Sequence, residues 1–338
     1  MITSASVPGR LSRWRRDSSR FRWIERWGIS TCSLCLGILT LLLFRRGLNF
    51  FPYILGSALL VWVAVVVCAD WRVYPSGGVG RILAFVLEYT VQTLLHGVFL
   101  FLLPIYYASA TFWAPTGGYV VLLAGAALLT TIDPWYRAVS RRIDSLELML
   151  FGFGWFSCLN LALALLDMNT TWALLLSSVG TFVALLPVLC RFRADHRRGA
   201  LIVAAVGLLG GPWLLRQAIP PVPIHLLGAT FAQSVVRLEP VRPVQEISAA
   251  ELSEWGKLWA WTEVVSPVAV SDSVHHVWLK DGQEVASLPM KSIVSQPGGF
   301  RVFSWKTGFG SDPIGYWSVE VRTSADRLIG RATLRVIR

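Results

Sequence analysis

The chain has 338 residues, of which 54% are hydrophobic and only 15% are charged. A typical soluble domain carries roughly 25% charged residues, so this composition excludes a protein that is soluble over its whole length. The formal net charge is +11, but all four lysines follow residue 256, so the positive charge before residue 217 comes from arginine. These arginines lie where membrane topology places them, which argues against nucleic acid as a partner.

Composition divides the chain near Arg216. Residues 1–27 are basic, residues 28–216 contain apolar segments joined by short loops, residues 217–232 form a Pro-rich linker, and residues 233–338 alternate in short runs. The pattern predicts a membrane α-helical bundle followed by an all-β, immunoglobulin-like sandwich domain. The basic N-terminal segment fits either an interfacial helix on anionic lipid or a disordered tail that sets topology.

Apolar segments in the first part approach the 17–25 residues that an α-helix needs to cross a bilayer. Tryptophans near their ends are typical of the interfacial belt of membrane proteins. We therefore expect about seven membrane-spanning helices. The lipid bilayer is accordingly an expected partner of the chain. The expected segments are residues 28–44, 48–68, 82–107, 118–132, 148–166, 172–190 and 199–215.

The arginines predict an orientation. With the N-terminus inside, the inner segments hold sixteen arginines, and the three outer loops hold only Arg45 and Arg46. By the positive-inside rule, the N-terminus is cytoplasmic and the β-domain lies outside the cytoplasm, in the periplasm if the membrane is a bacterial inner membrane. Arg45 and Arg46 oppose this bias, and the number of spans changes if the first two segments form a hairpin that does not cross.

Polar residues form a stripe on one face of the third segment. Glu88, Gln92 and His96 are spaced four residues apart, so their side chains lie along one side of the helix. Charge within a bilayer is costly, so such a stripe is a candidate proton relay or a binding site for a polar headgroup or a cation. The alternative is a structural stripe that hydrogen-bonds neighbouring helices. No metal-binding or catalytic motif accompanies it, so neither a cofactor nor a catalytic residue is predicted.

In the last third of the chain, apolar and polar residues alternate in short runs that are separated by turn residues. This period of two predicts β-strands. A helix at residues 248–255 is expected between the first two strands, with Ser248 as its N-cap and Glu251 in the capping-box position. Asp281 and Gly282 predict a hairpin. The expected strands are residues 234–239, 257–265, 273–280, 284–290, 300–306, 316–322 and 328–336.

Six tryptophans lie in this β-region. Large aromatics fill the core of a small sandwich that has no disulfides, but exposed ones stack on sugars or accompany basic residues that receive an anionic partner. Both alternatives remain open. No metal site is predicted, because adjacent His275 and His276 point to opposite faces of a strand. The candidate surface or motif residues are His276, Trp278, Arg301, Lys306 and Trp317.

Three short patterns resemble a known module. They are H-x-W at residues 276–278, R-x-F-S-x-K at residues 301–306 and G-x-W-x-V at residues 315–319. Together they resemble a bacterial C-terminal β-rich domain of unknown function. Residues 101–109 and 132–136 are similar to the multi-helix inner-membrane region that accompanies this domain. The resemblance covers roughly residues 82–136 and 258–336, implies the same architecture and supplies no activity.

The sequence therefore favours a non-catalytic membrane protein that binds, scaffolds or senses an envelope component. The periplasmic β-domain is the expected recognition surface, and its expected partner is a periplasmic protein or a glycan. The alternative is a transporter or channel lined by Glu88, Gln92 and His96. An enzyme acting on a lipid-linked substrate is the third hypothesis, and no nucleophile–base pair supports it.

Overall fold

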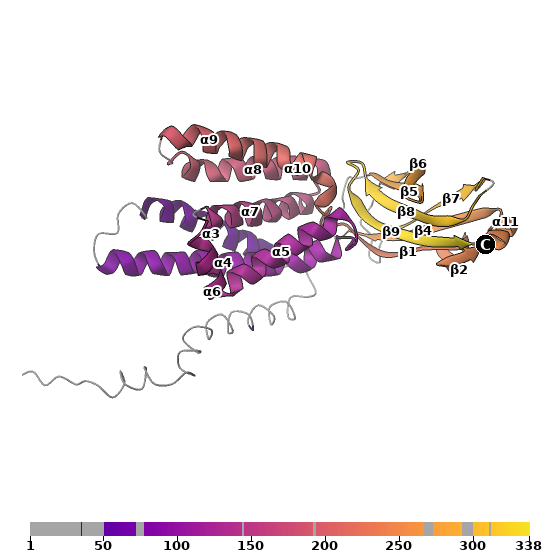
Figure 1. The fold of residues 1–338 in the computed structure, drawn as a ribbon, viewed down its shortest axis with the longest axis horizontal. Helices are drawn as coiled ribbons and strands as arrows, with labels where there is room; N and C mark the ends of the chain where they lie inside the picture. The colour runs from indigo at the N-terminus through magenta and orange to yellow at the C-terminus, as the bar shows by residue number, and fades with distance from the viewer. Residues whose placement is uncertain are drawn as a thin grey trace, which may run out of the picture. The chain divides into compact units, whose positions relative to one another are not determined.

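A computed structural model describes residues 35, 51–71, 78–143, 145–191, 194–266, 273–292, 300–310 and 312–338 (Figure 1). The chain divides into two compact units. One comprises Met1–Phe101 with Ala124–Phe151, and the other comprises Leu102–Leu123 with Gly152–Arg338. Helices α4, α5 and α7 each pass from one unit into the other.

The described N-terminal part is helical, as its apolar composition predicts. Its elements are α3 (Phe51–Trp71), α4 (Gly78–Ala108), α5 (Pro115–Thr131), α6 (Asp133–Ser140), α7 (Leu146–Leu165), α8 (Thr170–Leu189), α9 (Ala194–Ala205), the π-helix η2 (Val206–Gly210), α10 (Gly211–Leu214) and the 3₁₀-helix η3 (Arg216–Ala218).

Three described helical stretches are long and apolar enough to cross a membrane, Thr90–Ala108, Leu146–Leu165 and Thr170–Leu189. The count rises to four if α5 and α6, which are bent by 101°, form one span. These helices indicate a membrane protein. The described residues do not support seven spans, so that expectation is corrected.

Local breaks explain part of the difference. The fourth expected segment ends at Ile132, because Pro134 has no N–H to continue helix α5. The seventh is divided into α9, η2 and α10, with Pro212 at the start of the last piece. The first expected segment, apart from Cys35, and the basic residues 1–27 lie outside the described residues.

The C-terminal part contains nine described strands where seven were expected. Strand β1 begins at His225, inside the predicted linker, so only a short Pro-rich stretch separates it from η3. The strands are β1 (His225–Val236), β2 (Glu239–Val244), β3 (Glu246–Ser248), β4 (Lys257–Val265), β5 (Ser273–Lys280), β6 (Gln283–Ser292), β7 (Phe300–Thr307), β8 (Gly315–Thr323) and β9 (Leu328–Ile337).

These strands form two sheets that pack as a sandwich. One sheet has the order β2-β1-β4-β7, and the other has the order β3-β9-β8-β5-β6. All pairs are antiparallel except β3 with β9. Alternate residues of both sheets point inward and form the core, as the period-two pattern predicts.

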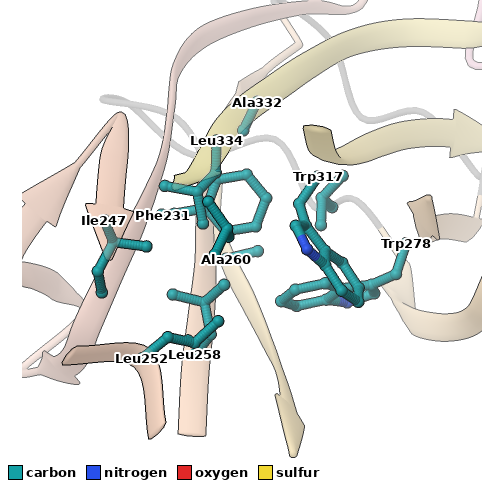
Figure 2. Close-up of a cluster of buried hydrophobic side chains, with 11 residues drawn as sticks. Phe231, Ile247, Leu252, Leu258, Ala260, Trp278, Trp317, Ala332 and Leu334 are labelled. Atoms are coloured by element: carbon teal, nitrogen blue, oxygen red, sulfur yellow. The ribbon is translucent and has the colours of Figure 1, made fainter. Parts of the chain in front are cut away.

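Aromatic side chains fill the centre of this core (Figure 2). Phe231, Trp278 and Trp317 are at most 2% exposed. The rings of Phe231 and Trp278 meet edge to face, with their centroids 5.6 Å apart. Two of the tryptophans therefore serve the core, which is how a small sandwich without disulfides buries enough apolar surface.

The predicted bridging helix is present as α11 (Ala249–Trp255). The Ser248 hydroxyl accepts a hydrogen bond from the Glu251 N–H at 3.1 Å, so the predicted N-cap is confirmed. Gly256 ends the helix in the left-handed conformation, which glycine adopts without strain. All the signals that place this helix lie within nine residues of one another.

Candidate functional site

The polar stripe of α4 contacts the break between α5 and α6. Gln92 is 5% exposed and its side-chain NH₂ donates to the Thr130 carbonyl at 2.9 Å and to Asp133 Oδ1 at 2.8 Å. In a continuous helix the Thr130 carbonyl would accept from residue 134, but Pro134 has no N–H. Gln92 therefore supplies the donor that the proline removes.

His96, one turn further along α4, bonds the same end of α5. Its Nδ1 lies 2.8 Å from Thr131 Oγ1, and that hydroxyl donates to the Ala127 carbonyl at 2.6 Å. Because the hydroxyl proton is committed to the carbonyl, His96 Nδ1 is the donor of the first bond. His96 is 4% exposed, so this contact is sheltered from solvent.

Glu88 lies on α4 one turn before Gln92, and its side chain is outside the described part of the structure. The structure thus brings Gln92 against Asp133 and His96 against Thr131, and neither partner was a predicted site residue. Asp133 is 8% exposed and begins α6, where a carboxylate also favours the helix N-terminus. The pair Asp133-Pro134 predicts a helix stop, and it was the one signal in the sequence that pointed to this position.

A second polar cluster crosses the core of the β-sandwich. His276 on β5 is fully buried and lies between Ser304 on β7, at 2.8 Å from Nδ1, and Thr262 on β4, at 2.9 Å from Nε2. Trp278 Nε1 donates to the same Ser304 hydroxyl at 3.0 Å. The H-x-W pattern and the serine of R-x-F-S-x-K therefore meet in one network that joins the two sheets.

The donors in this network follow one direction. Thr262 donates to the Val302 carbonyl at 3.3 Å, so its hydroxyl accepts from Nε2–H of His276. Nδ1 then accepts from Ser304, whose oxygen accepts from Trp278. This chain of hydrogen bonds is complete with a neutral imidazole. Burial lowers the pKa of His276 from 6.5 to about 4, so the network uses His276 as a structural group.

The other predicted β-domain residues differ in their surroundings. Arg301 forms ion pairs with Glu239 and Glu263, and its hydrogen bond to Glu263 raises the arginine's pKa. Lys306 is partly buried near the end of β7. Trp317 is 2% exposed, and its Nε1 donates to the Pro313 carbonyl at 2.9 Å. His276, Trp278 and Trp317 are thus core residues, whereas Arg301 borders the outer face of its sheet.

That outer face carries an aromatic cluster that we call the aromatic face: Trp259 on β4 with Phe303 and Trp305 on β7. Trp259 and Trp305 are directly opposite each other in register, with ring centroids 4.9 Å apart. Phe303 lies 5.5 Å from Trp259. Trp305 is 49% exposed and Trp259 is half-buried. Aromatic rings thus remain accessible at a position that is not in the core.

Charged groups flank the aromatic face at both ends. The Lys257 ammonium lies 4.9 Å from the centroid of the Trp259 ring and 4.8 Å from that of Trp305. At the other end, Arg301 and Glu263 are opposite each other in register and joined by a 3.1 Å ion pair. The face therefore offers apolar ring surface between hydrogen-bonding and charged groups.

Two families match different parts of the chain. Residues 7–260, more than half of the chain, match a family of unknown function (DUF5924). The chain belongs to the DUF5924 family. Residues 271–336 match a second family, described as a protein of unknown function (DUF2914). No curated protein matches the chain.

The boundary between the two matches falls inside the β-sandwich. The DUF5924 match ends within β4, and the DUF2914 match covers β5 to β9. Strand β7, from the DUF2914 match, pairs with β4 and completes the sheet that begins with β2 and β1. The His276 network also joins β5 and β7 to Thr262 of β4. The two matched regions therefore build one sandwich in this DUF5924 member.

A third buried polar group was missed by sequence reasoning. Arg327, in the turn between β8 and β9, is only 1% exposed. Its guanidinium donates to the carbonyls of Ile219 and Pro220 in the linker and of Thr170 at the start of α8. An arginine in a hairpin turn ordinarily points into solvent, so no local signal marks this residue.

Among the described residues, no group of three His, Cys, Asp or Glu side chains is placed to hold a metal ion.

Proposed function

We propose that this protein is a membrane-anchored recognition protein whose β-domain binds a carbohydrate-containing component of the bacterial envelope through the aromatic face. The helices hold the β-domain at the inner membrane, and the arginine distribution of the sequence favours a periplasmic location for it. The observation that carries the proposal is the outer-face pair of half-buried Trp259 and exposed Trp305, with Lys257 over both rings.

A sugar ring fits such a surface because it has an apolar C–H face and a polar rim. Trp305 and Phe303 present ring surface, and Lys257, Glu239 and Glu263 place donors and acceptors beside it. The ammonium between the two indoles favours saccharides that carry negative charge.

The position of the aromatic face also suits a ligand approaching from outside. Trp259 pairs with Ala232, seven residues beyond His225, where β1 begins after the linker. At about 3.3 Å per residue, the face lies roughly 20 Å along the sheet from the linker. A component that extends away from the membrane surface can reach it there.

The test measures binding of soluble envelope polysaccharides to the full chain in lipid nanodiscs, read by tryptophan fluorescence. We expect Trp305→Ala to weaken binding about fivefold, because an aromatic contact contributes roughly 1 kcal/mol. Trp213→Ala, which removes an exposed tryptophan of α10, is the matched control. Equal binding by the wild type and Trp305→Ala would contradict the proposal. Capture of a protein that depends on Trp305, without any saccharide, would replace glycan by a protein partner.

The alternative function is transport along Glu88, Gln92 and His96. The break that brings the Asp133 carboxylate against Gln92 favours it, since interrupted helices often carry coupling sites. Against it, Gln92 and His96 already bond the end of α5. A Glu88→Gln, His96→Ala double variant that folds but loses flux would support transport, and normal function in that variant would remove it.

A further inference from the structure

The β-domain is fastened to the helices of its own unit by the turn between β8 and β9. Arg327 Nη1 donates to the Thr170 carbonyl at 3.1 Å, in the first turn of α8. Its Nε and Nη2 donate to the Ile219 carbonyl at 3.3 and 3.1 Å, and Nη2 also reaches Pro220 at 2.6 Å. One planar guanidinium thus holds three carbonyls from two separate elements.

The neighbouring residue adds a second connection. The Asp326 carboxylate accepts from Gln217 of η3 at 2.8 Å and from Arg322 of β8 at 2.7 Å. Arg322 in turn pairs with Glu320, which is 5% exposed. The linker is therefore bonded to charged residues that run along β8.

On the helical side, the fastening point adjoins a buried polar network. Tyr106 donates to the Ser157 carbonyl at 2.9 Å, Tyr119 lies 2.6 Å from the Ser157 hydroxyl, and Asn160 donates to Tyr106 at 3.2 Å. Arg327 is close enough to act electrostatically on both phenols. Arg327 thus bonds α8 directly and acts electrostatically on one tyrosine of α4 and one of α5.

We propose that Arg327 is a coupling residue that transmits displacement of the β-domain to the first turn of α8 and to the linker. A guanidinium held by three carbonyls at 1% exposure has few alternative positions, because each lost bond leaves a buried, charged N–H group without an acceptor. Movement of the β8–β9 turn must therefore move Thr170 and residues 219–220 or break these bonds together. This inference does not depend on which ligand the aromatic face binds.

The experiment compares amide hydrogen exchange in full-length variants in lipid nanodiscs. Reporter amides in the linker are those of Val222 and Ile224, which donate to the carbonyls of Pro220 and Pro221. The Thr171 amide, which donates to Asn169 Oδ1 at 2.8 Å, reports on the start of α8. Amides of β5 and β8 in the sandwich core serve as internal controls.

Arg327→Met keeps side-chain length and removes the donors, so exchange of the linker and α8 reporters should accelerate by about tenfold or more while the sandwich core is unchanged. Arg327→Lys keeps one charged donor and should give a smaller acceleration. Arg331→Met, on the adjacent strand, removes only an ion pair to Glu320 and should leave the reporters unchanged.

Coupling between two sites is reciprocal, so a change in α8 should also affect the β8–β9 turn, and this gives a second test. Asn169→Ala removes the N-cap of α8 and should accelerate exchange at the Asp326 amide in the β8–β9 turn. Unchanged reporters in Arg327→Met would overturn the proposal. Equal acceleration in the sandwich core would also overturn it, because Arg327 would then support only the fold of the β-domain.

Discussion

His276 shows how one buried residue fixes the arrangement of two sheets. Its two nitrogens bond Thr262 and Ser304, which belong to the sheet opposite its own strand. Each bond is short and fully buried, so losing either leaves a polar atom without a partner inside the core. The adjacent His275 lies on the other face of β5 and is only half-buried, so the two histidines have different roles although the sequence places them side by side.

The lowered pKa of His276 predicts a pH-dependent stability. Below pH 6.5 the unfolded chain binds a proton at this residue and the folded chain does not, until the pH falls to about 4. The stabilisation is therefore complete above pH 6.5 and is lost progressively between pH 6.5 and 4, by up to about 3 kcal/mol. Thermal unfolding of the full chain in detergent, followed by tryptophan fluorescence between pH 7.5 and 4.5, measures this slope.

His276→Gln should abolish much of that slope and lower the unfolding temperature at pH 7.5, since it removes the titrating group and disturbs the network. His275→Gln is the control and should keep the slope of the wild type. A His276→Gln protein whose stability still falls as steeply between pH 6.5 and 4 would assign the effect to another group.

At the scale of elements, small residues decide how α7 and α8 pack. A Cβ at Gly180 of α8 would lie 2.9 Å from Leu159 of α7, and one at Gly152 of α7 would lie 3.5 Å from Leu185 of α8. At Gly180 the Leu159 side chain therefore occupies the space that a larger residue would need, whereas the contact at Gly152 is an ordinary one. Small residues are common at helix contacts in membrane bundles. The sequence shows these glycines but not which leucine faces each.

Gly180→Leu should lower the unfolding temperature of the detergent-solubilised protein, because overpacking a helix contact costs roughly 1–3 kcal/mol. Gly125→Leu, on an exposed part of α5 with nothing within 4 Å of an added Cβ, is the matched control. Equal unfolding temperatures for the two variants would show that α7 and α8 do not depend on close approach at Gly180.

Breaks between elements follow the same logic. Pro134 predicts that α5 stops, and it does stop there. The proline cannot predict that Gln92, thirty-eight residues before Thr130, satisfies the carbonyl left behind. The spacing of Glu88, Gln92 and His96 predicts a shared face of α4. Gln92 and His96 both bond the end of α5, and that contact could not be predicted from their spacing.

At the scale of the whole molecule, membrane orientation is the property with the clearest test. The sixteen-to-two arginine bias predicts a cytoplasmic N-terminus and a β-domain outside the cytoplasm. The bonds from Arg327 to Thr170 require that the β-domain lies at the end where α8 begins. In the predicted topology that end follows the outer loop between the fifth and sixth expected segments, so the two arguments agree.

A cysteine introduced at exposed Ser253 of α11 should react with a membrane-impermeant maleimide in intact spheroplasts. A cysteine at exposed Arg142, in a predicted inner loop, should react only after permeabilisation. The five native cysteines lie in apolar segments and give a measurable background in the unsubstituted chain. Labelling in the reverse order would invert the orientation and remove the periplasmic β-domain from the proposed function.

The sequence by itself determined the properties that are encoded locally. Apolar length and period predict helices before Arg216 and strands after it, Ser248 and Glu251 predict the start of α11, and Asp281 with Gly282 predicts the β5–β6 turn. Each signal depends on residues a few positions apart, so backbone preferences decide it.

Only the tertiary structure decided which polar residues are buried and what they bond. Gln92 meets Thr130 across 38 residues, His276 meets Ser304 across 28, and Arg327 meets Thr170 across 157. An arginine, a histidine or a tryptophan has the same local pattern in a core as on a surface. Its environment is set by the packing of elements far apart in the chain, and that packing assigns Trp278 to the core and leaves Trp305 exposed.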